Sequence, residues 1–195
     1  MKTALLIVLA LLSVQACAAD ERDEALFVQW FGHHDTTGFE RFLVRRHVDT
    51  VVPLYQLLRT ASDWQACHAP PFAVPPASHW PAVELTLRLL DTLRRQGVLT
   101  QFEVVSAYRD KRLNACAGGA AHSAHVQAFA VDLEFPAGSE APRRLCDFWK
   151  QQGGEWALGL SRYPSGRVHL DTTGYRTWGE DYSARTSYCL QPSSN

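Results

Sequence analysis

Apolar positions along this chain recur with two different periods, one typical of helices and one typical of strands. Residues from about 20 to 66 follow the helical period, and either Thr36 or Thr37 can cap a helix within this segment. The apolar positions of the segment that we expect in the core are Phe39, Phe42, Leu43, Val51, Val52, Leu54, Leu57 and Leu58. The first third of the chain is therefore predicted to be helical.

A proline-rich segment, residues 68–81, follows and holds five of the ten prolines of the chain. Proline lacks a backbone donor and fixes φ, so we expect a long ordered loop here rather than a regular helix or a central strand. The helical period then returns, because Pro81 suits a first helical turn and Gly97 suits a C-terminal cap. A helix is predicted over about residues 81–96, with one apolar face made of Val83, Leu87, Leu90 and Leu93.

The period changes to that of strands in the second half of the chain. Phe102 to Ser106 has the composition of a strand, and Ala128 to Phe135 alternates cleanly between large apolar positions and small or acidic ones. This alternation places Asp132 on the strand face opposite the core.

The last predicted elements are one helix and one further strand. The helix covers about Ala141 to Gln152 and is ended by Gly153, and residues 167–171 alternate again, so that His169 and Asp171 share one strand face. This succession of elements favours the α+β class, with helices packed on one side of a small, largely antiparallel sheet.

The composition is that of an ordinary globular domain. Of the 195 residues, 46% are hydrophobic, and 19 lysines and arginines balance 20 acidic residues. A chain of this length buries a sufficient core without oligomerising, so we expect one domain over residues 19–195 and a monomer. The near-zero net charge gives no basic surface for a phosphate backbone, and nucleic acid is not an expected partner.

The N-terminus has the pattern of a targeting segment. Lys2 precedes an apolar run from Ala4 to Val14, which has the length of a signal-peptide core and is too short for a membrane anchor. We expect residues 1–18 to direct export to the periplasm. An alternative stays open: the residues before Cys17 resemble a lipobox, and a lipid on Cys17 would tether the protein to a membrane.

The remaining cysteines are even in number, which suits an exported protein. Cys67, Cys116, Cys146 and Cys189 form no CxxC pair of the kind that zinc ribbons use, so two disulfides are expected. Four cysteines allow three pairings, and the sequence does not choose among them. We favour Cys67 with Cys116 and Cys146 with Cys189.

Three potential metal ligands stand out in the strand-rich half: His125, Asp132 and His169. A catalytic zinc site generally has three protein ligands drawn from imidazole and carboxylate, and its fourth position is left for water. Two histidines and one aspartate fit this open kind of site. The alternative is that these are hydrogen-bonded histidines and a surface carboxylate.

Two blocks of the sequence, about residues 102–135 and 156–179, resemble the signature blocks of the M15 family of zinc D-alanyl-D-alanine peptidases. Ser123, His125, Ala130 and Asp132 match the word Ser-x-His-x-x-Gly-x-Ala-x-Asp, and residues 168–171 match Val-His-x-Asp. The resemblance is to the subgroup of cell-wall carboxypeptidases and murein endopeptidases. It implies a fold like that of hedgehog and D-Ala-D-Ala peptidase domains, with Zn²⁺ bound by His125, Asp132 and His169.

The sequence departs from these words at two positions. Ala128 replaces the usual glycine. An alanine fits this position if the backbone φ is negative but not if φ is positive, and we expect the fold to absorb the change. Many relatives have a carboxylate three residues before the last ligand as general base, but Gly166 stands there in this chain. Asp171 is the leading replacement, or it orients the His169 imidazole instead. His122 is a weaker candidate for the base.

Three further residues are candidates for contacts with a substrate. The resemblance implies that Arg109 faces the site, where a guanidinium can bind the substrate or stabilise a developing oxyanion. Its alternative is a surface ion pair with Asp110 or another neighbouring residue. Ser123 can fix a loop beside the site by hydrogen bonding. Tyr163 can form a wall of the cleft, with core packing as its alternative.

These residues predict a zinc metallopeptidase that cleaves the peptide stems of peptidoglycan, either as a D-Ala-D-Ala carboxypeptidase or as a murein endopeptidase. No serine or cysteine nucleophile is needed, because zinc activates a water molecule. The glycine at position 166 favours an alternative, a noncatalytic cell-wall binding or assembly protein that keeps the peptidase fold.

Overall fold

The structure is a computed structural model, and it describes residues 24–191. The expected signal segment and Cys17 lie outside these residues. The chain divides into two compact units, residues 1–36 and 37–195, and in the first unit residues 24–31 are helical. The single domain expected from residue 19 stays a prediction. Among residues 24–191, no helix has both the length and the apolar character that a membrane span requires.

The second unit contains five α-helices: three precede the first strand, and two lie between strands. In chain order these are α2 (Thr37–Arg46), α3 (Leu54–Leu57), α4 (Trp80–Arg95), α5 (Lys111–Cys116) and α6 (Ala141–Gln152). Short 3₁₀ turns occur at η1 (Ala77–His79), η2 (Ala124–Gln127) and η3 (Ala184–Thr186).

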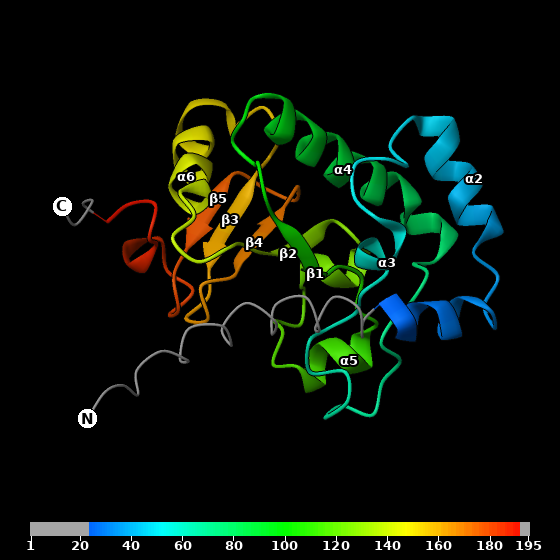
Figure 1. Cartoon of the computed structure of the whole chain (residues 1–195). Coiled ribbons are helices and arrows are strands. Elements are labelled where there is room, and N and C mark those ends of the chain that lie inside the picture. The colour runs from blue at the N-terminus through cyan, green and yellow to red at the C-terminus, as the bar shows by residue number, and fades with distance from the viewer. Residues whose placement is uncertain (1–23, 192–195) are drawn as a thin grey trace, which may run out of the picture. The chain divides into compact units, whose positions relative to one another are not determined.

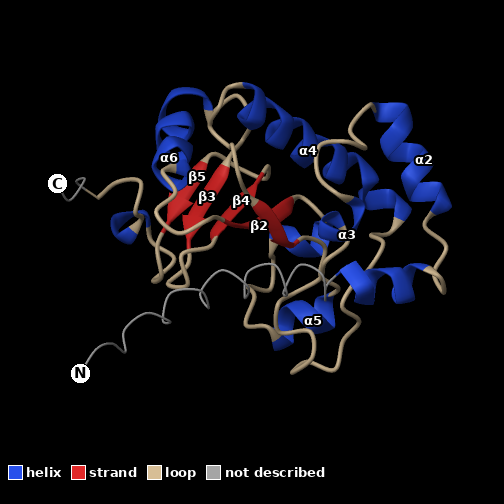
Figure 2. Cartoon of the chain, viewed as in Figure 1, coloured by secondary structure: helices blue, strands red, loops and turns tan. Residues whose placement is uncertain are grey.

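One five-stranded sheet forms the centre of this unit, and Figure 2 shows its strands as one group flanked by helices. Its strands are β1 (Glu103–Ser106), β2 (Ala130–Glu134), β3 (Gly159–Arg162), β4 (Val168–Asp171) and β5 (Arg176–Trp178). They lie in the order β1-β2-β4-β3-β5, and only the β3–β5 pair is parallel. The predicted α+β class with a largely antiparallel sheet is therefore confirmed.

One face of the sheet is apolar and supports the core. Val131 of β2, Leu170 of β4 and Leu160 of β3 are paired in register and buried. Figure 1 shows α4 and α6 along one side of the sheet, and both helices bury apolar residues. Two hydrogen bonds join these layers: Thr86 Oγ1 of α4 donates to the Phe129 carbonyl, and Trp149 Nε1 of α6 donates to the Leu158 carbonyl.

The predicted elements agree with the structure where the periodic signal is long. The helices expected at about 81–96 and 141–152 are α4 and α6, and Gly97 has the positive φ of 70° that a helix end requires. The segment 20–66 is less helical than predicted, because residues 47–53 between α2 and α3 and residues 58–66 after α3 form turns and irregular chain. Two strands were not predicted, β3 and β5: β3 has one large apolar residue, Leu160, among its four positions, and β5 has only three residues, so neither shows an alternation.

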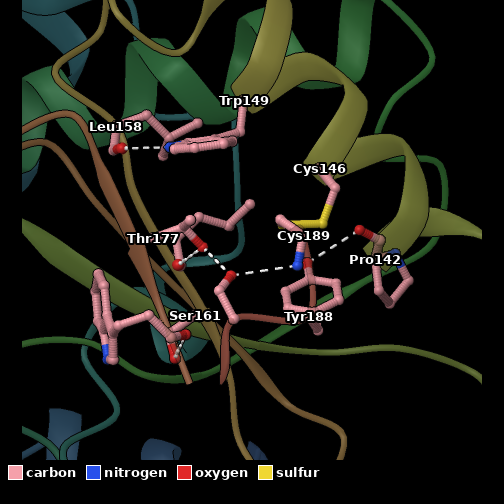
Figure 3. The surroundings of a disulfide bond; sticks show 11 residues. Pro142, Cys146, Trp149, Leu158, Ser161, Thr177, Tyr188 and Cys189 are labelled. Atoms are coloured by element: carbon pink, nitrogen blue, oxygen red, sulfur yellow. Dashed lines mark hydrogen bonds between the residues drawn. A yellow bond between two sulfur atoms is a disulfide. The ribbon is translucent and has the colours of Figure 1, made fainter. Parts of the chain in front are cut away.

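Both disulfides have the pairing that we favoured, Cys67–Cys116 and Cys146–Cys189. Figure 3 shows that the second bond joins α6 to the C-terminal segment, where Tyr188 Oη donates to the Pro142 carbonyl over 3.0 Å. In the same region Thr177 Oγ1 and Ser187 Oγ lie 2.5 Å apart. These contacts fix the end of the described chain against α6 and β5.

Candidate metal centre

The sheet face opposite the apolar one carries a row of polar side chains. Pairing in register aligns five residues, one from each strand: Ser106, Asp132, His169, Ser161 and Trp178. Strand alternation places Asp132 opposite the core, as predicted, but its side chain is not at the surface. Asp132 is only 5% exposed because other side chains cover it. The centre of the row is thus a buried polar site.

The third potential ligand, His125, comes from the 3₁₀ turn η2 just before β2. Ser123 caps this turn, its Oγ accepting a hydrogen bond from the His125 N–H over 3.3 Å. Ala128 ends the turn in the left-handed conformation, with φ 60° and ψ 22°. The fold does absorb the alanine, but at the positive φ that an alanine tolerates poorly, which costs about 1–2 kcal/mol.

The three predicted ligands meet at one point. His125 Nε2 lies 3.2 Å from Asp132 Oδ1, and His169 Nδ1 lies 3.1 Å from the same oxygen. The two ring nitrogens are 3.2 Å apart. Among residues 24–191 these three form the one group of His, Cys, Asp or Glu whose donor atoms are close enough to hold a metal ion.

The second nitrogen of each imidazole is held by an acceptor, which determines the tautomer. His125 Nδ1 lies 2.6 Å from the Ala107 carbonyl, and His169 Nε2 lies 2.9 Å from Asp171 Oδ2. A carbonyl and a carboxylate only accept hydrogen bonds, so these two nitrogens carry the protons. The other nitrogens face Asp132 Oδ1 and each other at the shared point, where a bound metal would accept their lone pairs.

Asp132 is also held on its second oxygen. Arg109, which is buried, forms an ion pair with Asp132 Oδ2 and donates from Nε to Ser106 Oγ over 2.9 Å. The expected alternative, a surface pair of Arg109 with Asp110, is absent because Asp110 caps α5 by accepting from the Leu113 N–H. Arg109 thus leaves Oδ1 of Asp132 directed at the imidazoles.

Tyr163 lies at the same oxygen. Its hydroxyl donates to Asp132 Oδ1 over 3.2 Å, and its ring lies edge-on to the His169 ring. Burial and the neighbouring Asp132 both raise the pKa of Tyr163, so the phenol stays protonated and remains a donor. Tyr163 therefore borders the shared point and is not a core residue.

Asp171 lies behind His169, away from the shared point. It is fully buried, and both of its oxygens accept hydrogen bonds: from His169, from the Thr173 N–H and hydroxyl, and from Arg176. Burial alone would raise the pKa of Asp171, but these donors hold it well below its ordinary value. Asp171 is thus a fixed anion.

The electrostatics of the three donors suit a cation. Burial lowers the pKa of His125, so its imidazole is neutral and available as a ligand near pH 7. Burial would raise the pKa of Asp132, but His125, His169 and Arg109 hold it well below its ordinary value. His125 and Asp132 therefore supply a neutral imidazole and a permanent carboxylate, which are common zinc ligands. Burial alone would lower the pKa of His169, but Asp132 and Asp171 raise it, so a metal competes with a proton at that imidazole.

The spacing of the donor atoms fits zinc. Ligands about 2.0–2.1 Å from a tetrahedral zinc lie about 3.3–3.4 Å from one another. The three measured separations, 3.1 to 3.2 Å, are close to this value without any rearrangement of side chains. Three protein donors leave one tetrahedral position for water or substrate.

A cleft of about 620 Å³ lies over the three donors. Residues of η2, β4 and β5 form its base, and two connecting segments form its walls: residues 61–63 and residues 117–124. The Cys67–Cys116 disulfide joins these two wall segments near their ends. Arg167 donates to Ser62 Oγ over 2.7 Å and to Glu134 over 2.8 Å, which connects one wall to the sheet.

The structure brings the predicted site residues together with one exception. Those that line the cleft are Arg109, His122, Ser123, His125, Asp132, Tyr163 and His169, and Asp171 stands behind them. Sequence reasoning did not single out Arg176 or Asp63, which also line the cleft. The Arg-x-Trp pattern after residue 175 was a usable signal for Arg176, whereas nothing in the sequence distinguishes Asp63 from other exposed aspartates.

Comparison with known proteins agrees with this site. A family model described as Peptidase M15 matches residues 57–171, a segment that contains both walls of the cleft and all three donors. No curated protein and no solved structure gives a significant match. Because the match covers more than half of the chain, this protein belongs to the Peptidase M15 family.

Proposed function

We propose that the protein is a zinc-dependent peptidase that cleaves the peptide stems of peptidoglycan, exported to the periplasm and lipidated if Cys17 is modified. The single observation that carries the proposal is the convergence of His125, Asp132 and His169 at the base of an open cleft. Membership of the M15 family supports peptide hydrolysis. The peptidoglycan substrate rests on the resemblance of the sequence to cell-wall peptidases of that family.

A zinc ion held by the three donors would polarise a scissile carbonyl and activate a water molecule. Around that point the chain supplies two hydrogen-bond donors. Arg109 lines the cleft beside Asp132, and the Tyr163 hydroxyl lies within hydrogen-bonding distance of the ligand oxygen. Either donor can stabilise the oxygen that becomes anionic, because both are held in place before substrate arrives.

The geometry supports Asp171 as the residue that orients His169. Its carboxylate contacts Nε2, while Nδ1 of the same ring faces the other ligands, so the imidazole separates Asp171 from the metal position. A general base must reach the water whose proton it accepts. We therefore propose the orienting role for Asp171 and look elsewhere for the base.

The wall of the cleft offers two proton acceptors. Among the described residues that line it, Asp63 and His122 are the carboxylate and the imidazole that are not among the three donors. Gly166, with φ 89°, holds the turn between β3 and β4 and has no side chain to take the proton. We propose that the base function, if carried by the chain, comes from one of these two residues.

A second candidate function is a noncatalytic cell-wall binding protein. The specific observation that favours it is the glycine at position 166, where many relatives have a carboxylate. A peptidase fold with a metal can retain binding after its activity is lost. The two functions differ in whether products form, so one experiment separates them.

The experiment uses purified muropeptides, the full protein and mass spectrometry of the products. We expect cleavage that a chelator abolishes and added zinc restores, and loss of a terminal D-alanine distinguishes a carboxypeptidase from an enzyme that opens a cross-link. Arg143→Ala, in an exposed ion pair on α6, is a control that should cleave normally. Intact muropeptides that remain bound to the protein would favour the noncatalytic function, and neither binding nor cleavage would contradict both.

A further inference from the structure

A second row of residues crosses the sheet next to the ligand row. In this row Asp171 of β4 is paired with Gly159 of β3, and Gly159 is paired with Arg176 of the edge strand β5. The middle strand thus presents a residue without a side chain between an aspartate and an arginine. The two outer residues are neighbours across the strand that separates them.

Arg176 reaches over β3 to the carboxylate of Asp171. Its Nη2 lies 2.7 Å from Asp171 Oδ2 and its Nη1 lies 3.0 Å from Oδ1, so the two side chains form a bidentate pair. Nη1 also donates to the Gly174 carbonyl over 3.0 Å, and the guanidinium lies 4.7 Å from the centre of the Trp178 ring. The arginine is therefore fixed from several directions.

The space for this pair exists because residue 159 is glycine. A Cβ atom at position 159 would lie 2.6 Å from Arg176 Nη1 and even closer to Asp171 Oδ2. Both distances are shorter than any normal contact of a Cβ atom. An alanine at this position must therefore displace the guanidinium, the carboxylate or both.

The pair connects directly to the metal ligand. Asp171 Oδ2, which accepts from Arg176, also accepts from His169 Nε2. His169 in turn directs Nδ1 at Asp132 and His125. A shift of the carboxylate would rotate the imidazole and misdirect its lone pair, because an outer partner fixes the orientation of a ligating histidine.

We propose that Arg176 is a positioning residue of the metal centre. The absence of a side chain at Gly159 leaves space for its guanidinium, which holds the Asp171 carboxylate. Through Asp171, Arg176 sets the direction of His169 Nδ1. This inference rests on the proposed zinc site and adds two residues to it. A merely structural role would make Arg176 a tether of β5, and its loss would then lower stability without changing metal affinity. The proposal instead predicts a change in metal affinity that depends on Asp171.

The test measures zinc affinity by competition with a chelator, on the full protein. Outer partners of ligating histidines typically contribute about 10–100-fold to metal affinity. We expect Arg176→Ala and Gly159→Ala each to weaken zinc binding within this range, and Arg176→Lys, which keeps the charge and loses the bidentate geometry, to weaken it less. Thermal unfolding identifies any variant that fails to fold, and Arg176→Lys then carries the comparison.

A double-mutant comparison separates positioning from tethering. If Arg176 acts through Asp171, the variant with both Arg176→Ala and Asp171→Asn should bind zinc about as weakly as Asp171→Asn alone. Matched controls are Arg143→Ala, from an exposed ion pair, and Gly154→Ala, where an added Cβ meets nothing within 4 Å. Losses that multiply in the double variant, or wild-type affinity in both Arg176→Ala and Gly159→Ala, would overturn the proposal.

A readout without metal separates this proposal from the proposed function. In the metal-free protein the His169 Nε2 proton is hydrogen-bonded to Asp171 and should give a downfield proton resonance that Arg176→Ala and Gly159→Ala shift or remove. Wild-type protein that binds zinc but cleaves no muropeptide would contradict the proposed function alone. A His169 resonance unchanged in both variants would contradict the positioning role, whether or not the protein is an enzyme.

Discussion

The two faces of the sheet are equally buried but are held by different forces. On one face Val131, Leu170 and Leu160 are buried, and dispersion and the hydrophobic effect stabilise them. On the other face Asp132 and His169, from the same two strands β2 and β4, are buried as polar groups that satisfy one another. Adjacent residues of one strand thus belong to opposite kinds of interior.

The difference indicates what each face tolerates. An apolar contact is lost in proportion to the atoms removed, whereas a buried charge that loses its partner keeps the full cost of its desolvation. Truncation on the apolar face should therefore lower stability alone, whereas a substitution on the polar face that keeps the charge should change metal binding and turnover more than stability.

The largest stability effect is expected on the apolar face. Leu170 is fully buried between His169 and Asp171 along β4, but it points to the opposite side. Leu170→Ala should lower the free energy of unfolding by about 2–5 kcal/mol, because it removes buried methyl groups and leaves a cavity. Denaturant unfolding measures the loss, and zinc content should stay at one ion per folded chain. Loss of zinc from folded Leu170→Ala protein would show that the two faces are not separable.

For Arg109 we expect a large loss of turnover and only a small loss of stability, the reverse of the result expected for Leu170. Arg109→Lys keeps a positive charge beside Asp132 but loses the planar fork that binds Asp132 and Ser106 together. Turnover of muropeptides should fall by about 10²–10³-fold, the range typical for loss of one oxyanion donor, with a much smaller change in unfolding free energy. Arg88→Lys, in an exposed ion pair of α4, is the matched control. Turnover equal to wild type would remove Arg109 from the site.

The two disulfides allow a further comparison, because each closes a loop of similar length but only one of them borders the cleft. They close loops of similar length, with separations of 49 and 43 residues. Replacing either pair by alanines should lower stability by a similar amount, about 2–4 kcal/mol. Only loss of Cys67–Cys116, which joins the walls of the cleft, should also change KM for muropeptides. Equal KM values in both variants would show that this bond does not shape the cleft.

The smallest effect concerns the alanine at the end of η2. Ala128→Gly should raise the free energy of unfolding by about 0.5–1 kcal/mol, because relief of the left-handed strain exceeds the extra entropy that glycine loses on folding. Ala130→Gly, two residues later in β2, should instead lower stability by a similar amount. Destabilisation by Ala128→Gly would mean that the conformation at residue 128 costs an alanine nothing.

Much of the fold could be predicted because long elements have a strong period. The helix over residues 141–152 has buried positions at Leu145, Phe148 and Trp149, and its predicted bounds agree with the structure. β3 has four residues with one large apolar side chain, and β5 has three residues, so neither carries the alternation that predicted β2 and β4. These two strands are defined by their pairing with β4 and with each other, and a local apolar pattern does not contain that information.

The residues of the candidate site also differ in how well the sequence predicts them. Its three donors could be found because their spacing matches a family word, and the turn of η2 and the pairing of β2 with β4 bring them together. The partners of those donors could be predicted only in part. Arg109 and Asp171 were candidates, but the sequence left Asp171 with two roles and gave no sign of Arg176, because the contact of Arg176 with both oxygens of Asp171 depends on the pairing of β5 with β3 across Gly159.

We propose that His125, Asp132 and His169 hold one zinc ion that is needed for peptide cleavage. The most direct measurement is metal content and muropeptide turnover on the same samples of native protein and His125→Ala. We predict about one zinc per native chain, and for folded His125→Ala loss of most of the metal together with the turnover. Equal zinc content in the two proteins, or cleavage by folded His125→Ala at the native rate, would contradict the account.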